Sequence, residues 1–163
     1  MNINTTPITT NFCILFLDFD GVTHPEPCLS ANEHCKLPLI ESVLRDYPAV
    51  KIVISSSWRD HYSLEEMSAF FAPDIASRLI GVTPSIKRPS SSWLPGHVPE
   101  FEREWEIESW MKVNCAWDTP WMAIDDRPYW FRPDSANLLV THSRTAFTPA
   151  DQVTLRTMLQ ERL

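Results

Sequence analysis

Two aspartates, Asp18 and Asp20, follow directly on an apolar run and precede a glycine, Gly21. The run, residues 12–17, has the length of a buried strand, and the glycine lets the backbone turn sharply. Ligands of open α/β sheets bind at the carboxyl ends of parallel strands, so the two carboxylates stand where chemistry is expected. Paired carboxylates there suit proton transfer or the binding of a hard cation. Asp and Gly are also ordinary turn residues, so the other strand ends have to decide.

Two further apolar runs end in small polar or acidic residues. They are residues 50–54, which lead into Ser55, Ser56 and Ser57, and residues 121–124, which lead into Asp125 and Asp126. Three strands that end in this way indicate one shared site at the carboxyl edge of a sheet.

Together with an Arg-x-x-Glu-Ile pattern at residues 103–107, these strand ends resemble the four motifs of the haloacid-dehalogenase-like (HAD) superfamily of phosphohydrolases, in the same order. Within that superfamily, the amino-acid sequence of four segments is similar to that of the small bacterial HAD domains grouped with Swiss Army Knife RNA repair proteins. These segments are residues 15–25, 54–59, 103–110 and 123–126. The resemblance covers roughly residues 12–148.

The resemblance implies a role for each aspartate of the first motif. Asp18 would attack phosphorus in line and carry a transient aspartyl-phosphate. Asp20 would protonate the leaving group and then activate water, as general acid and base. An acid at this second position fits a phosphatase or phosphomutase, whereas transport ATPases of the superfamily carry Thr there.

The same resemblance implies a magnesium site. Mg²⁺ would be held by the carboxylate of Asp18, the backbone carbonyl of Asp20, and Asp125 or Asp126, because hard oxygen ligands suit this ion. The sequence leaves open which of Asp125 and Asp126 is the direct ligand. A turn after the strand is the plainer interpretation of this acidic pair.

The phosphate group would be bound by a serine hydroxyl and an arginine. Ser55 is the first choice for the hydroxyl and Ser56 the second, because the triple serine leaves the register open. Arg103 matches the family pattern near the start of a helix, and it would bind phosphate and orient Asp18. Lys87 and Arg88 are alternatives for the cation, and any of the three could be a solvated surface charge.

The remaining patterns predict alternating strands and helices. Helices are expected at residues 38–47, 63–71, 100–113 and from 148 onward, and further strands at 79–83 and 136–140. This alternation predicts an α/β, Rossmann-like three-layer sandwich, and the family order 3-2-1-4-5 would put the first of about five parallel strands at the centre. In the helix at 100–113, we expect Phe101, Trp105, Ile107, Trp110 and Met111 on the buried side.

At 163 residues, the chain is expected to form a single HAD-like domain, residues 1–163. Residues 1–11 are expected to be a loose lead-in, and 83–99 an irregular loop rich in proline and serine. The segment at 22–37 is short, which leaves little material for a cap. A minimal cap would leave the site open and favour a bulky phosphorylated substrate: a nucleic-acid end, a nucleotide or a phosphoprotein.

Net charge and cysteine content limit which binding partners and which compartment we expect for the protein. The net charge of −7 argues against general, charge-driven binding to nucleic acid or membranes. The four cysteines show no short paired spacing, and no signal peptide or membrane span is recognisable, so a reduced, cytoplasmic protein is expected. A basic and aromatic cluster could stack on nucleic-acid bases or serve packing alone: Arg127, Tyr129, Trp130 and Arg132.

The sequence therefore predicts a Mg²⁺-dependent phosphohydrolase. The alternative is a HAD fold that is catalytically silent and serves as a binding or regulatory module. Nothing in the sequence indicates an oligomeric state.

Overall fold

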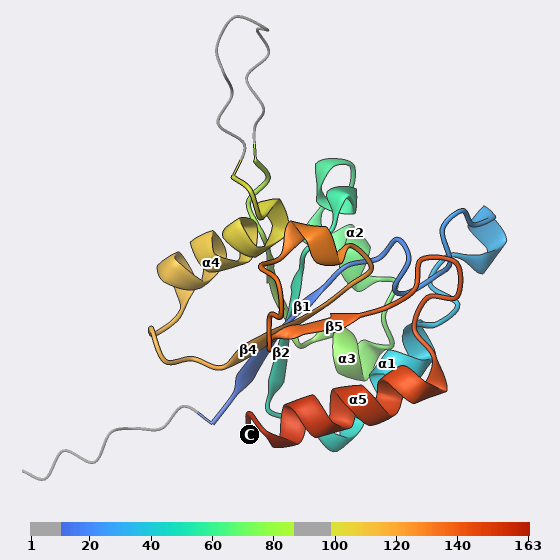
Figure 1. The fold of residues 1–163 in the computed structure, drawn as a ribbon. Helices are drawn as coiled ribbons and strands as arrows, with labels where there is room; N and C mark the ends of the chain where they lie inside the picture. Colours follow the sequence, from blue (N-terminus) through green and yellow to red (C-terminus); the bar gives the residue numbers. More distant parts are fainter. Residues whose placement is uncertain (1–10, 87–98) are drawn as a thin grey trace, which may run out of the picture.

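The computed structural model describes residues 11–86 and 99–163. Five parallel strands form one sheet in the order β3-β2-β1-β4-β5, which confirms the predicted α/β topology (Figure 1). The strands are β1 (Cys13–Leu17), β2 (Val50–Ile54), β3 (Leu79–Val82), β4 (Trp121–Asp125) and β5 (Leu138–Val140).

Helices cover both faces of this sheet. The helices are α1 (Leu37–Asp46), α2 (Leu64–Ser68), α3 (Pro73–Ala76), α4 (Glu102–Asn114) and α5 (Pro149–Gln160), with 3-10 turns η1 (Ser30–Asn32), η2 (Ser57–Asp60) and η3 (Pro128–Trp130). In Figure 1, α1, α3 and α5 lie below the strands and α4 lies above them. The result is the predicted three-layer sandwich.

Strand β1 is the centre of the core, and all five of its residues are buried. Successive side chains of a strand point to opposite faces. Accordingly Leu15 and Leu17 belong to the cluster formed with α1 and α5, whereas Ile14 and Phe16 belong to the cluster formed with α4. The ring of Phe16 packs edge-to-face against Trp110.

The predicted helix at 63–71 is shorter than expected. Helix α2 ends at Ser68, and α3, which was not predicted, begins at Pro73. The start of α2 is a capping box, in which Ser63 and Glu66 each accept a hydrogen bond from the other's backbone N–H. Helix α3 has only four residues, which are too few to show a recognisable hydrophobic periodicity in the sequence.

The buried side of α4 differs from the prediction. Trp105 was expected inside, but it is 44% exposed, and the buried residues include Arg103, Glu104 and Glu106 beside Ile107. Polar side chains are tolerated there because they have partners: the backbone N–H of Arg132, for example, donates to Glu104 at 2.7 Å. Apolar periodicity alone therefore misplaced Trp105 and missed the buried charged residues of this helix.

The predicted lead-in and irregular loop fall largely outside the described residues. Cys13, Cys28, Cys35 and Cys115 are free thiols. Among the described helices, none has both the length and the apolar character needed to cross a membrane.

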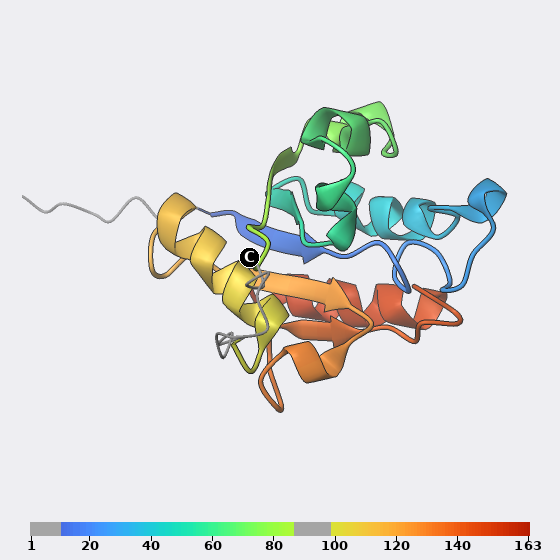
Figure 2. The ribbon, with the colours of Figure 1, turned by 90° about the horizontal axis from the view of Figure 1, so that it is seen from above.

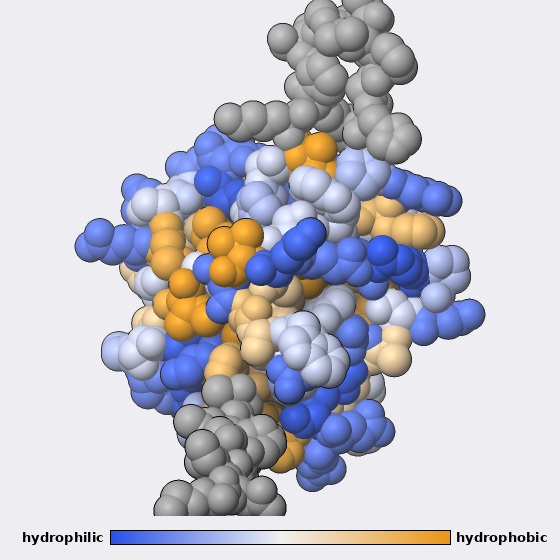
Figure 3. Space-filling view, turned by 90° about the vertical axis from the view of Figure 1, so that its left-hand side faces the viewer, coloured by the Kyte–Doolittle hydropathy of each residue, from blue (hydrophilic) through white to orange (hydrophobic). Residues whose placement is uncertain are grey.

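The surface on one side of the molecule mixes hydrophobic and hydrophilic residues (Figure 3). Val113, near the end of α4, is 83% exposed, and Trp117, in the loop that follows, is 97% exposed. This loop enters β4 at the amino-terminal end of the strand, away from the acidic strand ends. Trp117 is therefore a suitable control position for substitutions of aromatic residues near the site.

Phe16→Ala should lower the free energy of unfolding by about 3–5 kcal/mol, because it leaves a cavity between the sheet and α4. Chemical denaturation would measure the change. Val153→Ala, at a position of α5 that is 67% exposed, is the control and should alter stability by less than about 0.5 kcal/mol. An equal effect of the two substitutions would contradict this description of the core.

Candidate active site

The acidic strand ends meet because β1 pairs with both β2 and β4. Leu17, the last residue of β1, is in register with Ile54 of β2 and Ile124 of β4. Figure 2 shows β1 and β4 side by side, with their arrowheads at the same end of the sheet. The residues that follow these strands therefore converge at one edge.

Three carboxylates lie together at this edge. Ligand oxygens of Asp18, Asp125 and Asp126 are all within 4.8 Å of one another. Asp18 is 4% exposed and Asp125 1% exposed. Burial raises the pKa of Asp18 to about 6, and burial together with the charge of Asp18 raises the pKa of Asp125 well above its ordinary value. When these carboxylates are ionised side by side, they repel one another, so a positive charge is required among them.

The carboxylate cluster has the donor set of a hard-cation site. Its ligands are oxygens alone, as Mg²⁺ prefers. The Oδ1 atom of Asp126 is buried and accepts no hydrogen bond from any described residue, although Arg127 Nε lies 3.8 Å away. Burial raises the pKa of Asp126 as well. The residues present therefore fit a divalent cation.

Gly21 makes room for this cluster. Its φ is +71°, which L side chains rarely adopt, and a Cβ atom at this position would overlap the carboxylate of Asp126. The glycine thus supplies both the turn after the first motif and the space that Asp126 occupies.

Asp20 stands outside the carboxylate cluster, held by two nitrogen atoms. Trp58 Nε1 donates to both of its oxygens at 3.1 Å, and His24 Nε2 lies 3.0 Å from Oδ1. The hydrogen bond with His24 is the main cause that lowers the pKa of Asp20. The Asp20 side chain is 33% exposed, in contrast to the buried Asp18. Neither His24 nor Trp58 was predicted to hold Asp20, because the two residues come from different loops.

Arg103 supplies the buried positive charge beside the cluster. Its Nε lies 3.4 Å from Asp125 Oδ2, and its NH1 group donates to the backbone carbonyl of Ser55 at 2.5 Å. Burial lowers the pKa of Arg103, but the carboxylates around it, Asp18 first, more than offset this and raise it overall. Arg103 therefore lies beside the carboxylates, whereas the alternatives Lys87 and Arg88 lie outside the described residues.

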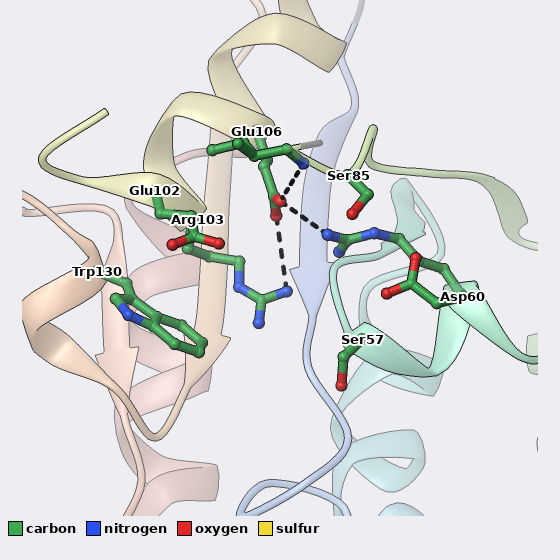
Figure 4. Close-up of a pocket in the computed structure, with 9 residues that line it drawn as sticks. Ser57, Asp60, Ser85, Glu102, Arg103, Glu106 and Trp130 are labelled. Atoms are coloured by element: carbon green, nitrogen blue, oxygen red, sulfur yellow. Dashed lines mark hydrogen bonds and ion pairs between the residues drawn. The ribbon is translucent and has the colours of Figure 1, made fainter. Parts of the chain in front are cut away.

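A second buried ion pair braces Arg103. Glu106 lies 3.9 Å from Arg103 NH1 and accepts a hydrogen bond from Arg59 NH2 at 2.7 Å (Figure 4). Arg59 also donates to the backbone carbonyl of Ser56 at 3.1 Å. These contacts tie α4 to the loop after β2, and the pairing of Arg59 with Glu106 was not predicted from the sequence.

The two candidate serines point to different surroundings. The Ser55 hydroxyl is buried and has no hydrogen-bond partner among the described residues. The Ser56 hydroxyl accepts from the backbone N–H of Trp58 at 3.3 Å and helps to lower the pKa of Asp18. Ser56 is therefore the hydroxyl that adjoins Asp18, although Ser55 was the first choice.

In the basic and aromatic cluster, Trp130 packs against two guanidinium groups. The guanidinium carbons of Arg103 and Arg127 lie over the Trp130 ring, 5.1 and 4.8 Å from its centroid. Arg132 forms ion pairs with Glu104 and Glu108. In this cluster Tyr129 remains 63% exposed.

One comparison with known proteins identifies a family. A family model described as "HAD domain in Swiss Army Knife RNA repair proteins" matches residues 14–152. Neither the curated proteins nor the solved structures yielded a match.

Asp18→Asn should raise the free energy of unfolding of the metal-free protein by about 1–3 kcal/mol near pH 8. The folded-state pKa of about 6 lies above the ordinary 3.8, so the wild-type protein loses stability as the pH rises through this window. The gain should therefore shrink near pH 5, where the wild-type carboxyl is largely protonated in the folded state.

Denaturation in the presence of a chelator at both pH values measures this effect. Asp118→Asn, at an exposed loop position, is the control and should change little at either pH. A loss of stability in Asp18→Asn near pH 8 would contradict the electrostatic picture of the cluster.

Proposed function

The chain belongs to the HAD domains of Swiss Army Knife RNA repair proteins, and we propose that it is a Mg²⁺-dependent phosphohydrolase that acts through an aspartyl-phosphate. One observation carries the proposal: the buried carboxylates of Asp18, Asp125 and Asp126 converge, while a separately held carboxylate, Asp20, stands beside them. A nucleophile, a cation site and an acid/base need these different environments.

Asp18 is suited to be the nucleophile. The backbone N–H of Phe19 donates to its Oδ1 at 2.8 Å and fixes the orientation of the carboxylate. One oxygen of Asp18 attacks phosphorus, and the bond from phosphorus to the ester oxygen of the leaving group breaks. The charge of Arg103 nearby favours the ionised, reactive form of the nucleophile.

The charge of the phosphate needs compensation in this acidic surrounding. Asp18, Asp125, Asp126 and the backbone carbonyl of Asp20 would hold Mg²⁺, which when bound neutralises charge on the phosphoryl oxygens. Arg103 and a serine hydroxyl would contact the remaining oxygens of the phosphate. The position of Ser56 beside Asp18 supports Ser56 for this contact, with the unpaired Ser55 hydroxyl as the alternative.

Asp20 would act as general acid and then as general base. In the first step its proton goes to the leaving-group oxygen; in the second step it takes a proton from water, which attacks phosphorus and releases Asp18 and inorganic phosphate. Its pKa is lowered in the free protein, and the negative charge of a bound phosphate would raise it toward the protonated form. Trp58 and His24 keep the carboxyl aimed through both steps.

The exposed side of Asp20 supports a substrate whose bulk extends out of the site. Candidates of this kind are a nucleic-acid end, a nucleotide and a phosphoprotein. The description of the family, which names RNA repair proteins, supports the first two.

Release of inorganic phosphate from an aryl phosphate and from 3′- and 5′-phosphorylated oligonucleotides tests the proposal. Wild-type protein should release phosphate only with Mg²⁺. Asp18→Asn should reduce the rate to background because the nucleophile is lost, and Asp20→Asn should lower kcat by about 10²–10⁴-fold. Asp118→Asn should retain wild-type rates.

Metal binding separates the proposal from the silent module. Calorimetric titration with Mg²⁺ should show binding to the wild-type protein and weaker binding to Asp125→Asn. Binding of Mg²⁺ without turnover of any phosphoester would refute the enzyme and favour a binding or regulatory module.

A further inference from the structure

A cavity of about 350 Å³ opens beside the proposed acid/base, Asp20. Its lining residues are Asp20, Glu33, Ser57, Trp58, His61 and Tyr62. Asp18 is not among them, and neither is a lysine or arginine of the described chain. The cavity therefore adjoins the group that would protonate the leaving group, not the group that would attack phosphorus.

One wall of this cavity is a braced pair of aromatic rings. Trp58 and Tyr62 are stacked, with ring centroids 5.3 Å apart and an interplanar angle of 24°. Behind them, Phe70 meets both rings edge-on, at 5.7 Å from Trp58 and 5.9 Å from Tyr62. Tyr62 is 41% exposed, so the pair offers a fixed aromatic surface to the cavity.

The position of the cavity indicates which part of a substrate it would hold. A general acid has to lie within hydrogen-bond reach of the oxygen that it protonates. The leaving group bonded to that oxygen must therefore extend into space that Asp20 borders. The cavity is such a space, so it is suited to the leaving group and not to the phosphate.

The chemistry of the lining selects among leaving groups. Without a lysine or arginine, and with the carboxylates of Asp20 and Glu33, the cavity disfavours a second phosphate. An aromatic surface binds planar bases by stacking. Glu33, His61 and Ser57 offer hydrogen-bond partners for hydroxyl and amino groups.

We propose that this cavity binds the nucleoside part of a nucleotide substrate, with the base stacked on Tyr62. This inference rests on the proposed phosphohydrolase function. The substrate is then one terminal nucleotide, which either a free nucleoside monophosphate or the phosphorylated end of a strand can supply. A sugar alkoxide is a poor leaving group and requires a general acid. The phenolate of phosphotyrosine, with a phenol pKa of about 10, depends on one much less.

The contribution of the base can be measured as a ratio of rate constants. With Mg²⁺ present, kcat/KM for adenosine 3′- or 5′-monophosphate should exceed that for ribose 5-phosphate by about tenfold or more. Tyr62→Ala should reduce this ratio at least about fivefold, mainly through KM of the nucleotide. Tyr62→Phe keeps the stacking surface and should preserve the ratio.

Two control variants and two further substrates sharpen the test. Trp117→Ala removes an exposed aromatic residue far from the strand ends and should leave the ratio unchanged. Tyr129→Ala tests an exposed aromatic residue of the segment that follows β4. A single-stranded oligonucleotide with a terminal phosphate, compared with the mononucleotides, identifies the source of the nucleoside, and a phosphotyrosine peptide tests the rival aromatic leaving group.

Three results would overturn the inference while leaving the phosphohydrolase intact: equal kcat/KM for nucleotides and ribose 5-phosphate, a ratio that depends on Tyr129 and not on Tyr62, or a preference for the phosphotyrosine peptide. If no substrate is hydrolysed, the proposed function fails. Quenching of tryptophan fluorescence by adenosine 5′-monophosphate then tests whether the cavity binds a nucleoside at all. Quenching that Tyr62→Ala weakens would support the nucleoside cavity by itself, and absence of binding would refute it.

Discussion

Mutual repulsion among Asp18, Asp125 and Asp126 is the constraint on which the rest of this structure depends. Buried carboxylates at this spacing are costly unless positive charge is buried with them. Arg103 meets this need from α4, and Glu106 and Arg59 in turn hold Arg103 in place. Helix α4 therefore packs on the sheet through ionic contacts near the site and through Ile107 and Trp110 farther along. The charges at the strand ends thus take part, together with apolar packing, in attaching one whole layer of the sandwich.

The predictions that held rest on strong local signals. Apolar runs of strand length that end in Asp18 and Asp125, together with the family resemblance, were enough to predict the strand order and the edge where the carboxylates meet. Arg103 was predicted from its match to the family's Arg-x-x-Glu-Ile pattern, and in the structure it lies beside the cluster. Where the prediction relied on apolar periodicity alone, it misplaced Trp105, because α4 buries charged as well as apolar side chains.

The parts that sequence reasoning missed are long-range side-chain contacts. Nothing in the spacing of Asp20 and Trp58 indicates that the indole N–H reaches both carboxylate oxygens, since the two residues are 38 positions apart. The pairing of Arg59 with Glu106 is equally invisible before the fold is known. Within the triple serine, the Ser56 hydroxyl adjoins Asp18, whereas the Ser55 hydroxyl is buried without a hydrogen-bond partner among the described residues, and no local pattern distinguishes the two.

The double contact of Trp58 has a consequence for how such a domain can diversify. The indole that forms part of the cavity wall also holds Asp20, so a replacement at this position would alter the cavity and remove hydrogen bonds of Asp20 together. Tyr62 and Glu33 line the same cavity without touching Asp20 through any described hydrogen bond. Substitutions at Tyr62 and Glu33 would therefore change the lining of the cavity and leave the hydrogen bonds of Asp20 in place, whereas replacement of Trp58 would change both.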